Sequence, residues 1–238
     1  MKTPRILVVS VIAAMVLSAG SCDAEPDATP SPSPSPAASP IVTPEPTPSP
    51  EPVFDPHPPL SDLYVTTDGI LPLQIGVPLA TNTGAAMLFL EVDSCYSAEL
   101  GITSGDLDRW IADYSLGMHP DGWEMRPFGV DVSGALPLWR IDVFSDTLTT
   151  PEGIGIGSLL TDVQAAYPDL VTGVSDALSQ IYWIEGANGY VVFEVQDDSE
   201  GFQPPGTPPT VILMRVIMAG EDPNWQASNS GNVAGACF

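Results

Sequence analysis

Basic residues are scarce in this chain of 238 residues, which holds six lysines and arginines against 30 aspartates and glutamates. Lys2 and Arg5 lie within the first 21 residues, so the remainder has no lysine, four arginines and a formal charge of −26. Such a surface repels nucleic acid and anionic lipid headgroups, so no nucleic-acid partner is expected. It favours cations or basic partners, although the same charge also serves solubility alone. The acidic run DDSEG at 197–201 lacks the ligand spacing of an EF-hand, so we expect no specific calcium site there.

Histidine and cysteine are nearly as rare, which limits the chemistry open to the chain. Of the two histidines, His57 lies in a proline-rich segment and His119 in a polar GMHPDG turn. A single domain histidine without a free thiol supplies neither a nucleophilic triad nor a Cys/His zinc site. The chain also has no P-loop, and GIGIGS at 153–158 lacks the third glycine of a dinucleotide fingerprint. We therefore assign no catalytic residue, no metal ligand and no cofactor.

Long apolar runs are confined to the N-terminus. Two basic residues precede an uncharged apolar run at 6–19, which is too short to span a membrane and is typical of a signal peptide. The run ends in LSAGSC, with three small residues directly before Cys22. This pattern resembles the lipobox of bacterial lipoproteins, which implies that residues 1–21 are removed and that Cys22 is lipidated. Ordinary signal cleavage beside an incidental cysteine is the alternative.

Residues 22–59 form a proline-rich linker. Fourteen of the 27 prolines fall between Pro26 and Pro59, interleaved with serine, threonine and alanine. This composition offers little to bury and favours an extended, partly polyproline II chain. At ~3.1 Å per residue such a stalk reaches on the order of 100 Å, enough to lift a domain through a layer of wall polymer.

From residue 60 onward the composition is globular, with room for one core or two small modules. We divide it into modules at 60–148 and 149–238, because TTDGILPLQIGVPL at 66–79 is a weaker version of TPEGIGIGSLLTDVQAAYPDL at 150–170. Hydrophobic spacing predicts helices at 84–90 (where a buried strand fits equally), 104–115 and 157–167. Alternation and the GANG turn predict strands at 123–132, 138–145, 180–185, 190–196 and 210–218.

The helix at 157–167 has the clearest signals. Ser158 is placed to cap its N-terminus, and Pro168 ends it. Val163 lies in the apolar stripe, which needs a sheet beneath it.

Gly157, Ser158, Asp162 and Val163 together resemble the signature of small helix-on-sheet lipoprotein modules. The barrel-assembly lipoprotein family BamE and the β-lactamase-inhibitor-protein-like domains share that architecture. The region 60–238 is similar to uncharacterised secreted lipoproteins of actinobacteria, which have two such modules in tandem. The first module departs from the signature at Pro78 and Asn82, where serine or threonine and valine are usual. The resemblance implies an α+β fold of two tandem modules, each a short helix or helices packed on an antiparallel sheet.

Those lipoproteins also have one cysteine after the first module's helix and another near the C-terminus. Cys95 and Cys237 match these positions. In an oxidising extracytoplasmic space the two can form a disulfide, which leaves Cys22 for the lipid.

Strand parity singles out one face of the second module. Trp139, Ile141 and Val143 share a face, so Arg140 points the other way. By the same alternation Tyr190 turns outward, whereas the direction of Arg215 is left open. One interpretation of this face is that its arginines pair with acidic side chains of neighbouring strands. The other is a face that docks a protein partner through Arg140, Tyr190 and Arg215, with the tyrosine as an aromatic anchor.

Two functions remain open. The first is a non-catalytic envelope lipoprotein, held at the outer face of the bacterial cytoplasmic membrane through Cys22, that binds a protein or cell-wall partner. The alternative is a hydrolase that uses carboxylates on wall polymer or peptide, for which no acid and nucleophile pair stands out.

Replacing Cys22 with serine is expected to release the protein from the membrane fraction, because the acyl chains would have no attachment site. Intact mass of the native protein should show those chains on Cys22. An unmodified N-terminus at another residue would contradict the lipoprotein prediction.

Cys95 and Cys237 are expected to resist alkylation under denaturing, non-reducing conditions. Closing so long a loop stabilises a fold by up to about 5 kcal/mol in the chain-entropy model. Stoichiometric labelling of both thiols without reductant would rule the disulfide out.

Overall fold

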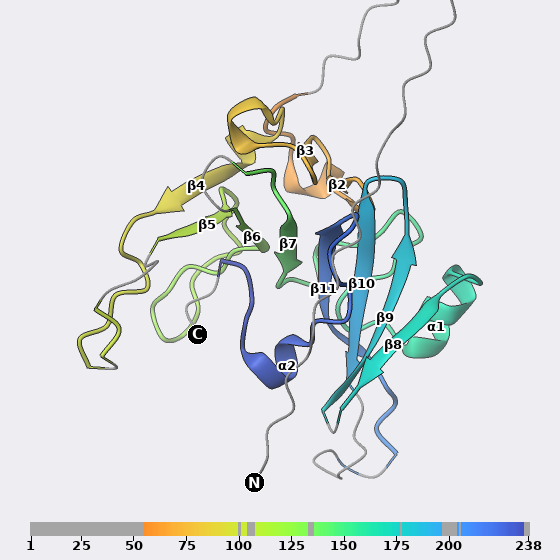
Figure 1. Ribbon diagram of the computed structural model, residues 1–238. Coiled ribbons are helices and arrows are strands. Elements are labelled where there is room, and N and C mark those ends of the chain that lie inside the picture. The colour runs from red at the N-terminus through yellow and green to blue at the C-terminus, as the bar shows by residue number, and fades with distance from the viewer. Residues whose placement is uncertain are drawn as a thin grey trace, which may run out of the picture. The chain divides into compact units, whose positions relative to one another are not determined.

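Antiparallel strands are the main regular structure of the described chain (Figure 1). The computed structural model describes residues 55–99, 101–103, 108–132, 136–176, 178–196, 204 and 206–235, which belong to the second of two units, Glu51–Phe238. One sheet has the strand order β4-β5-β6-β7-β11-β10-β9-β8. Its strands are β4 (Leu88–Glu91), β5 (Arg109–Ala112), β6 (Phe128–Asp131), β7 (Arg140–Val143), β8 (Val171–Ser175), β9 (Ser179–Glu185), β10 (Gly189–Gln196) and β11 (Val211–Met218). A small sheet holds β1 (Val65–Thr66), β2 (Gly69–Ile70) and β3 (Leu73–Gln74).

Two four-stranded meanders build the large sheet. Strands β4 to β7 pair in chain order, and so do β8 to β11. The last strands of the two meanders, β7 and β11, then pair with each other. The predicted boundary between residues 148 and 149 thus falls between two halves of one continuous sheet.

Helix is a minor part of the described residues. The α-helices are α1 (Leu160–Ala166) and the single turn α2 (Ala227–Ser230), with short 3-10 helices at Leu60–Asp62, Leu79–Thr81 and Ala85–Met87. The predicted α+β fold of two tandem helix-on-sheet modules is therefore wrong, because the chain is mostly β and its eight main strands share one sheet. No helix in this part of the chain is long and apolar enough to cross a membrane.

The helix predicted at 104–115 shows why the predicted α+β fold class was wrong. Its described part contains strand β5, and residues 104–107 lie outside the described part. Ala112 and Tyr114 belong to the core cluster and Trp110 packs against it, so the side chains that face the core recur at every second residue. Ile111 falls on the opposite face. A pattern of only four apolar residues fits both the helical period of 3.6 residues and the strand period of two. The segment is a strand because it pairs with β4 and β6.

The range 84–90 fits a helix or a buried strand by sequence, and the structure has the strand at its end. One 3-10 turn at Ala85–Met87 leads directly into β4, which pairs with β5 along its whole length. Leu79–Thr81 is likewise only a 3-10 turn, bounded by Pro78 and Asn82.

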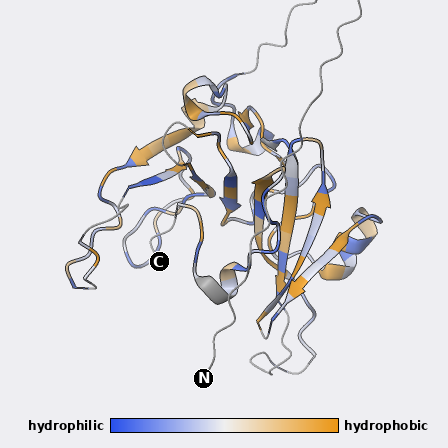
Figure 2. Ribbon diagram, viewed as in Figure 1, coloured by the Kyte–Doolittle hydropathy of each residue, from blue (hydrophilic) through white to orange (hydrophobic). Residues whose placement is uncertain are grey.

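Helix α1 lies within the predicted range 157–167 but begins later. Leu159 is its N-cap residue, and the Ser158 hydroxyl instead accepts a hydrogen bond from the Gly155 amide at 3.0 Å. Val163 is fully buried in the core, and Tyr167 stacks on Phe193 of β10 with ring centroids 5.7 Å apart. Figure 2 shows the polar and apolar sides of this short helix.

The strands predicted in the second half correspond to β9, β10 and β11. Residues 186–188 connect β9 to β10, and the hairpin is closed by a hydrogen bond from the Gly186 amide to the Gly189 carbonyl at 2.8 Å. Strand β6 covers only the end of the range 123–132, because residues 116–125 form a separate loop.

The large sheet has two different faces. The core face carries Val143, Val191, Phe193 and Val216, which pack with α1 and the small sheet. We call the opposite face the strap face. It carries the charged residues Arg140, Asp142, Glu194 and Arg215, which are all buried.

The chain enters this unit alongside β5. His57, predicted to lie in the stalk, stacks on Tyr114 with ring centroids 4.6 Å apart. The Tyr114 hydroxyl donates to the Pro58 carbonyl at 2.8 Å. Burial raises the pKa of Tyr114 to about 12, and Asp55 and Asp113 add to that shift.

Candidate functional site

The charges of the strap face are buried because the end of the chain lies over them. After β11, residues 219–235 turn back across the sheet through α2 toward β6 and β5 (Figure 1). We call this segment the C-terminal strap. Its backbone bonds to side chains of four strands of the large sheet, β5, β7, β10 and β11.

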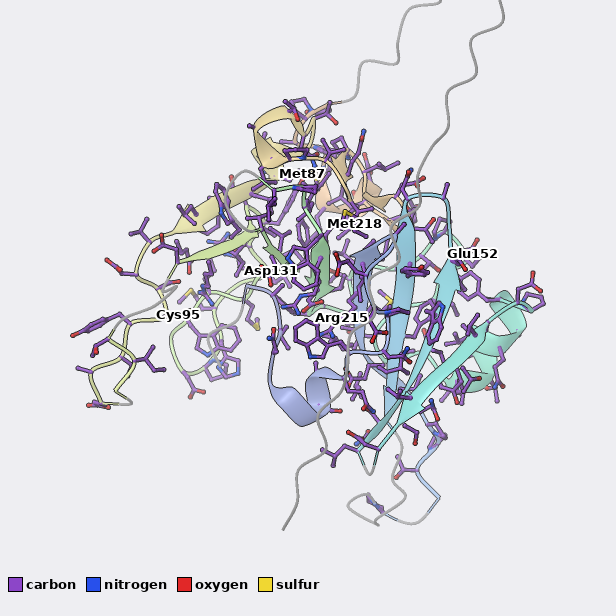
Figure 3. All side chains as sticks on the ribbon, in the orientation of Figure 1. Met87, Cys95, Asp131, Glu152, Arg215 and Met218 are labelled. Carbon is purple, nitrogen blue, oxygen red and sulfur yellow. The ribbon has the colours of Figure 1, made fainter. Side chains whose placement is uncertain are left out.

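An ion pair between β7 and β11 is at the centre of these contacts. Asp142 and Arg215 are directly opposite each other in the register, and both are almost completely buried. The guanidinium donates to both carboxylate oxygens, through Nε at 2.8 Å and Nη2 at 3.2 Å. Figure 3 labels Arg215 beside the strap. Burial raises the pKa of the Asp142 carboxyl, whereas Arg215 and then Arg140 oppose that shift.

The strap satisfies the remaining hydrogen bonds of this pair. The Ala234 amide donates to Asp142 Oδ2 at 2.7 Å. Arg215 donates to the carbonyls of Trp225 at 2.8 Å and Asn232 at 3.3 Å. Charges buried without such partners would cost several kcal/mol each. The strap and the ion pair therefore depend on each other.

Arg140 lies next to this pair and is held more loosely. Its Nη2 donates to the Asn232 side chain at 2.8 Å, and its nitrogens lie 3.5 Å from carboxylate oxygens of Asp131 and Asp142. Among the described residues, no group forms a hydrogen bond with its buried Nε and Nη1 atoms. Burial lowers the pKa of this guanidinium, and Arg215 adds to the effect while Asp142 and Asp131 oppose it.

Glu194 of β10 fixes the middle of the strap. Its carboxylate accepts hydrogen bonds from the Ala227 and Ser228 amides, each at 2.8 Å, at the start of α2. The buried Ser179 hydroxyl donates to the same carboxylate at 2.8 Å. A carboxylate at this position suits the free amides and the dipole of a helix N-terminus.

A glycine allows the end of the strap to lie directly on β6. A Cβ atom on Gly129 would lie 2.4 Å from the Ala234 carbonyl oxygen and 2.7 Å from the Gly235 Cα. Contacts this short do not occur, so a side chain here would displace the strap.

A groove opens where the strap ends. Its volume is about 820 Å³, and it is lined by parts of β5, the loop between β5 and β6, the segment after β7, and the strap itself. Apolar side chains make up much of the wall, among them Ile111, Leu116, Met125, Phe144 and Val233. We call it the strap groove.

The loop at the rim of the groove presents an exposed tryptophan. Residues 116–125 fold back on themselves through backbone bonds, including Leu116 to Met125 at 2.9 Å. Trp123 is 54% exposed, and His119 stacks on it with ring centroids 4.4 Å apart. A large aromatic side chain left in water by an ordered loop is typical of a contact surface.

The positive side chains at the groove are neutralised by ion pairs, and one negative side chain is not. Arg109 pairs with Glu91, and Arg126 pairs with Glu124, each at 2.5 Å. Asp146 is exposed and has no ion-pair partner among the described residues. All four arginines of the described chain are thus paired with carboxylates of the chain itself.

The deeply buried carboxylates serve the strap. Asp142 and Glu194 accept hydrogen bonds from strap amides, so their geometry is accounted for by the fold. A glycosidase-type acid needs a carboxyl shielded from water. In the groove, Asp146 is exposed and the Glu124 side chain is 39% exposed. This arrangement favours binding over carboxylate catalysis. Among the described residues, no three His, Cys, Asp or Glu side chains are grouped to hold a metal ion.

Arg140 and Tyr190 lie on one face, as strand parity indicated, and Arg215, whose direction was left open, lies on the same face, but the two arginines are covered. Arg140 and Arg215 are each 1% exposed, so the strap, and not a partner, contacts them. Tyr190 is half-buried beside Val192 and Ile217. No local pattern in the sequence predicts that a segment after β11 covers this face.

The lipid and disulfide predictions involve residues outside the described part. Cys22 and Cys237 lie there, as does the acidic run at 197–201. Cys95 is buried after β4. Arg109 of the neighbouring strand donates to the Gly235 carbonyl at 3.1 Å, two residues before Cys237. The disulfide stays a prediction.

Comparison with known proteins adds little. No protein-family model matches the chain, and no curated protein matches it. Among solved structures it is similar to the uncharacterized protein YfeY from Escherichia coli, with a TM-score of 0.36 and 15% identity over 65% of this chain and 99% of that one. This likeness is too weak to support an argument about fold or function. The resemblance to actinobacterial lipoproteins stays a prediction, whereas the helix-on-sheet architecture it implied does not hold.

Replacing Asp142 with asparagine is expected to lower the free energy of unfolding by about 3–5 kcal/mol, because two buried arginines lose their shared carboxylate. Urea denaturation measures this, and hydrogen exchange at the Ala234 amide reports the strap directly. Asp169→Asn removes the same charge from an exposed turn and should change stability by less than about 0.5 kcal/mol. Equal stability of the two variants would contradict the role given to Asp142.

Proposed function

We propose that this protein is a non-catalytic extracytoplasmic binding module, anchored at the outer face of the bacterial cytoplasmic membrane by lipid on Cys22. The proline-rich segment 22–59 acts as a stalk that holds the folded unit away from the membrane. The anchor and stalk rest on the lipobox resemblance and the composition of these residues.

The strap groove is the binding site in this proposal. The observation that supports it most strongly is an apolar groove of about 820 Å³ beside Trp123, an aromatic side chain that is 54% exposed on an ordered loop. Pockets of this volume, walled by apolar side chains with a few polar groups, are typical ligand sites.

The occupant is a segment of a protein partner that combines apolar and basic side chains. Its apolar side chains fit the wall formed by Leu116, Met125 and Phe144. A basic side chain of this segment suits Asp146, which has no ion-pair partner among the described residues, whereas Arg109 and Arg126 are already paired with Glu91 and Glu124. The formal charge of −26 after residue 21 attracts such a partner and raises its association rate.

The test is isothermal titration of the full chain, purified in detergent, with a capped hexapeptide of alternating leucine and arginine. We expect binding that weakens at higher ionic strength. Trp123→Ala should reduce the affinity roughly thirtyfold, as loss of a ~2 kcal/mol hot spot does. Tyr96→Ala is the matched control, because Tyr96 is equally exposed at 54% and does not line the groove.

A peptide of alternating leucine and glutamate separates the apolar from the electrostatic contribution to binding. We expect it to bind much more weakly, because it meets carboxylates of the same sign. Equal binding of the two peptides, or unchanged affinity in Trp123→Ala, would contradict this proposal.

A further inference from the structure

A second pocket lies where the strap begins. Its volume is about 620 Å³, and the residues that line it include Trp139, Trp225, Met218, Glu221 and Asp222. We call it the tryptophan pocket. Trp225 is 39% exposed, and both acids are exposed. No residue of the strap groove takes part in it.

The two indoles already contact one cation. Their centroids are 6.1 Å apart, and the rings are inclined by only 22°. The Arg140 guanidinium carbon lies 4.9 Å from the centroid of Trp139 and 5.1 Å from that of Trp225. Both distances are within the range of cation–π attraction. The same two rings line the pocket, so a ligand there also meets electron-rich aromatic surface.

The local charge favours a further cation despite the nearby arginine. Arg140 lies 3.5 Å from carboxylate oxygens of both Asp131 and Asp142, and Arg215 pairs with Asp142 as well. Two arginines are thus balanced by two buried or half-buried carboxylates. Glu221 and Asp222 add two negative charges at the pocket itself.

The lining selects the kind of cation. Ammonium groups that are strongly hydrated lose much of their solvation beside indole and thioether groups, whereas alkylated ammonium groups lose less. The volume also leaves room for an apolar substituent. A phosphate next to the ammonium would meet two carboxylates and be disfavoured.

We propose that the tryptophan pocket binds an alkylated ammonium cation without a neighbouring anionic group, through Trp139 and Trp225 with Glu221 and Asp222 as counter-charges. The site is separate from the strap groove and does not require that the groove bind a partner.

The test is a titration of the full chain, labelled with ¹⁵N-tryptophan, with choline. The indole N–H signals are assigned by single tryptophan-to-phenylalanine variants. We expect choline to shift the signals of Trp139 and Trp225 and to leave that of Trp123 in place. The neutral isostere 3,3-dimethyl-1-butanol should bind roughly tenfold more weakly, because it has the same shape and no charge. Phosphocholine should also bind more weakly than choline.

Variants separate a local site from the overall charge. Glu221→Gln removes one carboxylate from an exposed position and should weaken choline binding roughly two- to fivefold. Asp169→Asn also removes one negative charge, but at a distance from the pocket, and this variant should bind choline as the parent does. Trp225→Leu should abolish the shift of the Trp139 signal.

Several results would overturn the proposal. One is an equal affinity for the neutral alcohol, which would leave only an apolar pocket. Another is unchanged binding in Glu221→Gln. The third is the absence of any choline-dependent shift of the Trp139 and Trp225 signals in the parent chain.

Discussion

The ion pair between Asp142 and Arg215 determines how the rest of the strap face is built. It joins the two meanders across the β7–β11 junction, where the residues are directly opposite each other. Because both side chains are buried, their remaining hydrogen bonds must come from protein groups. The strap supplies them through Trp225, Asn232 and Ala234. Both pockets follow, since Trp225 walls one and the end of the strap walls the other.

The same arrangement sets the electrostatics of the surface. Buried ion pairs contribute little net stability, because desolvation offsets much of the attraction. Here they determine where the charges lie. The few arginines are held in ion pairs, whereas most of the aspartates and glutamates stay at the surface. A protein with four arginines after residue 21 thus presents almost no positive charge to a partner. The choice of cationic ligands for both pockets comes from this distribution.

The sequence predicted local structure better than the global arrangement. Alternation and the GANG turn were sufficient for β9, β10 and β11, because those strands are long and pair with their neighbours in the chain. Helices were predicted over the ranges that contain the short strands β4 and β5, with a buried strand as an equal alternative at 84–90, because the apolar spacing of such short segments fits either period. Strand parity placed Arg140 correctly on the face away from Ile141, yet it could not show a cover formed by residues 219–235. Trp123 and Trp225 were not predicted as site residues. The tryptophan in the polar GMHPDGW segment was the available signal.

The contacts of the strap join residues that are far apart in the chain. Asp142 and Ala234 are separated by 92 positions, as are Arg140 and Asn232, whereas Arg109 and Gly235 are separated by 126. Closing loops of this length is entropically costly and contributes to slow folding. The hairpins of each meander need no such closure. Docking of the strap removes Arg140, Asp142 and Arg215 from water and supplies a wall to each pocket. Any opening of this one segment would therefore expose the buried charges and dismantle both pockets together.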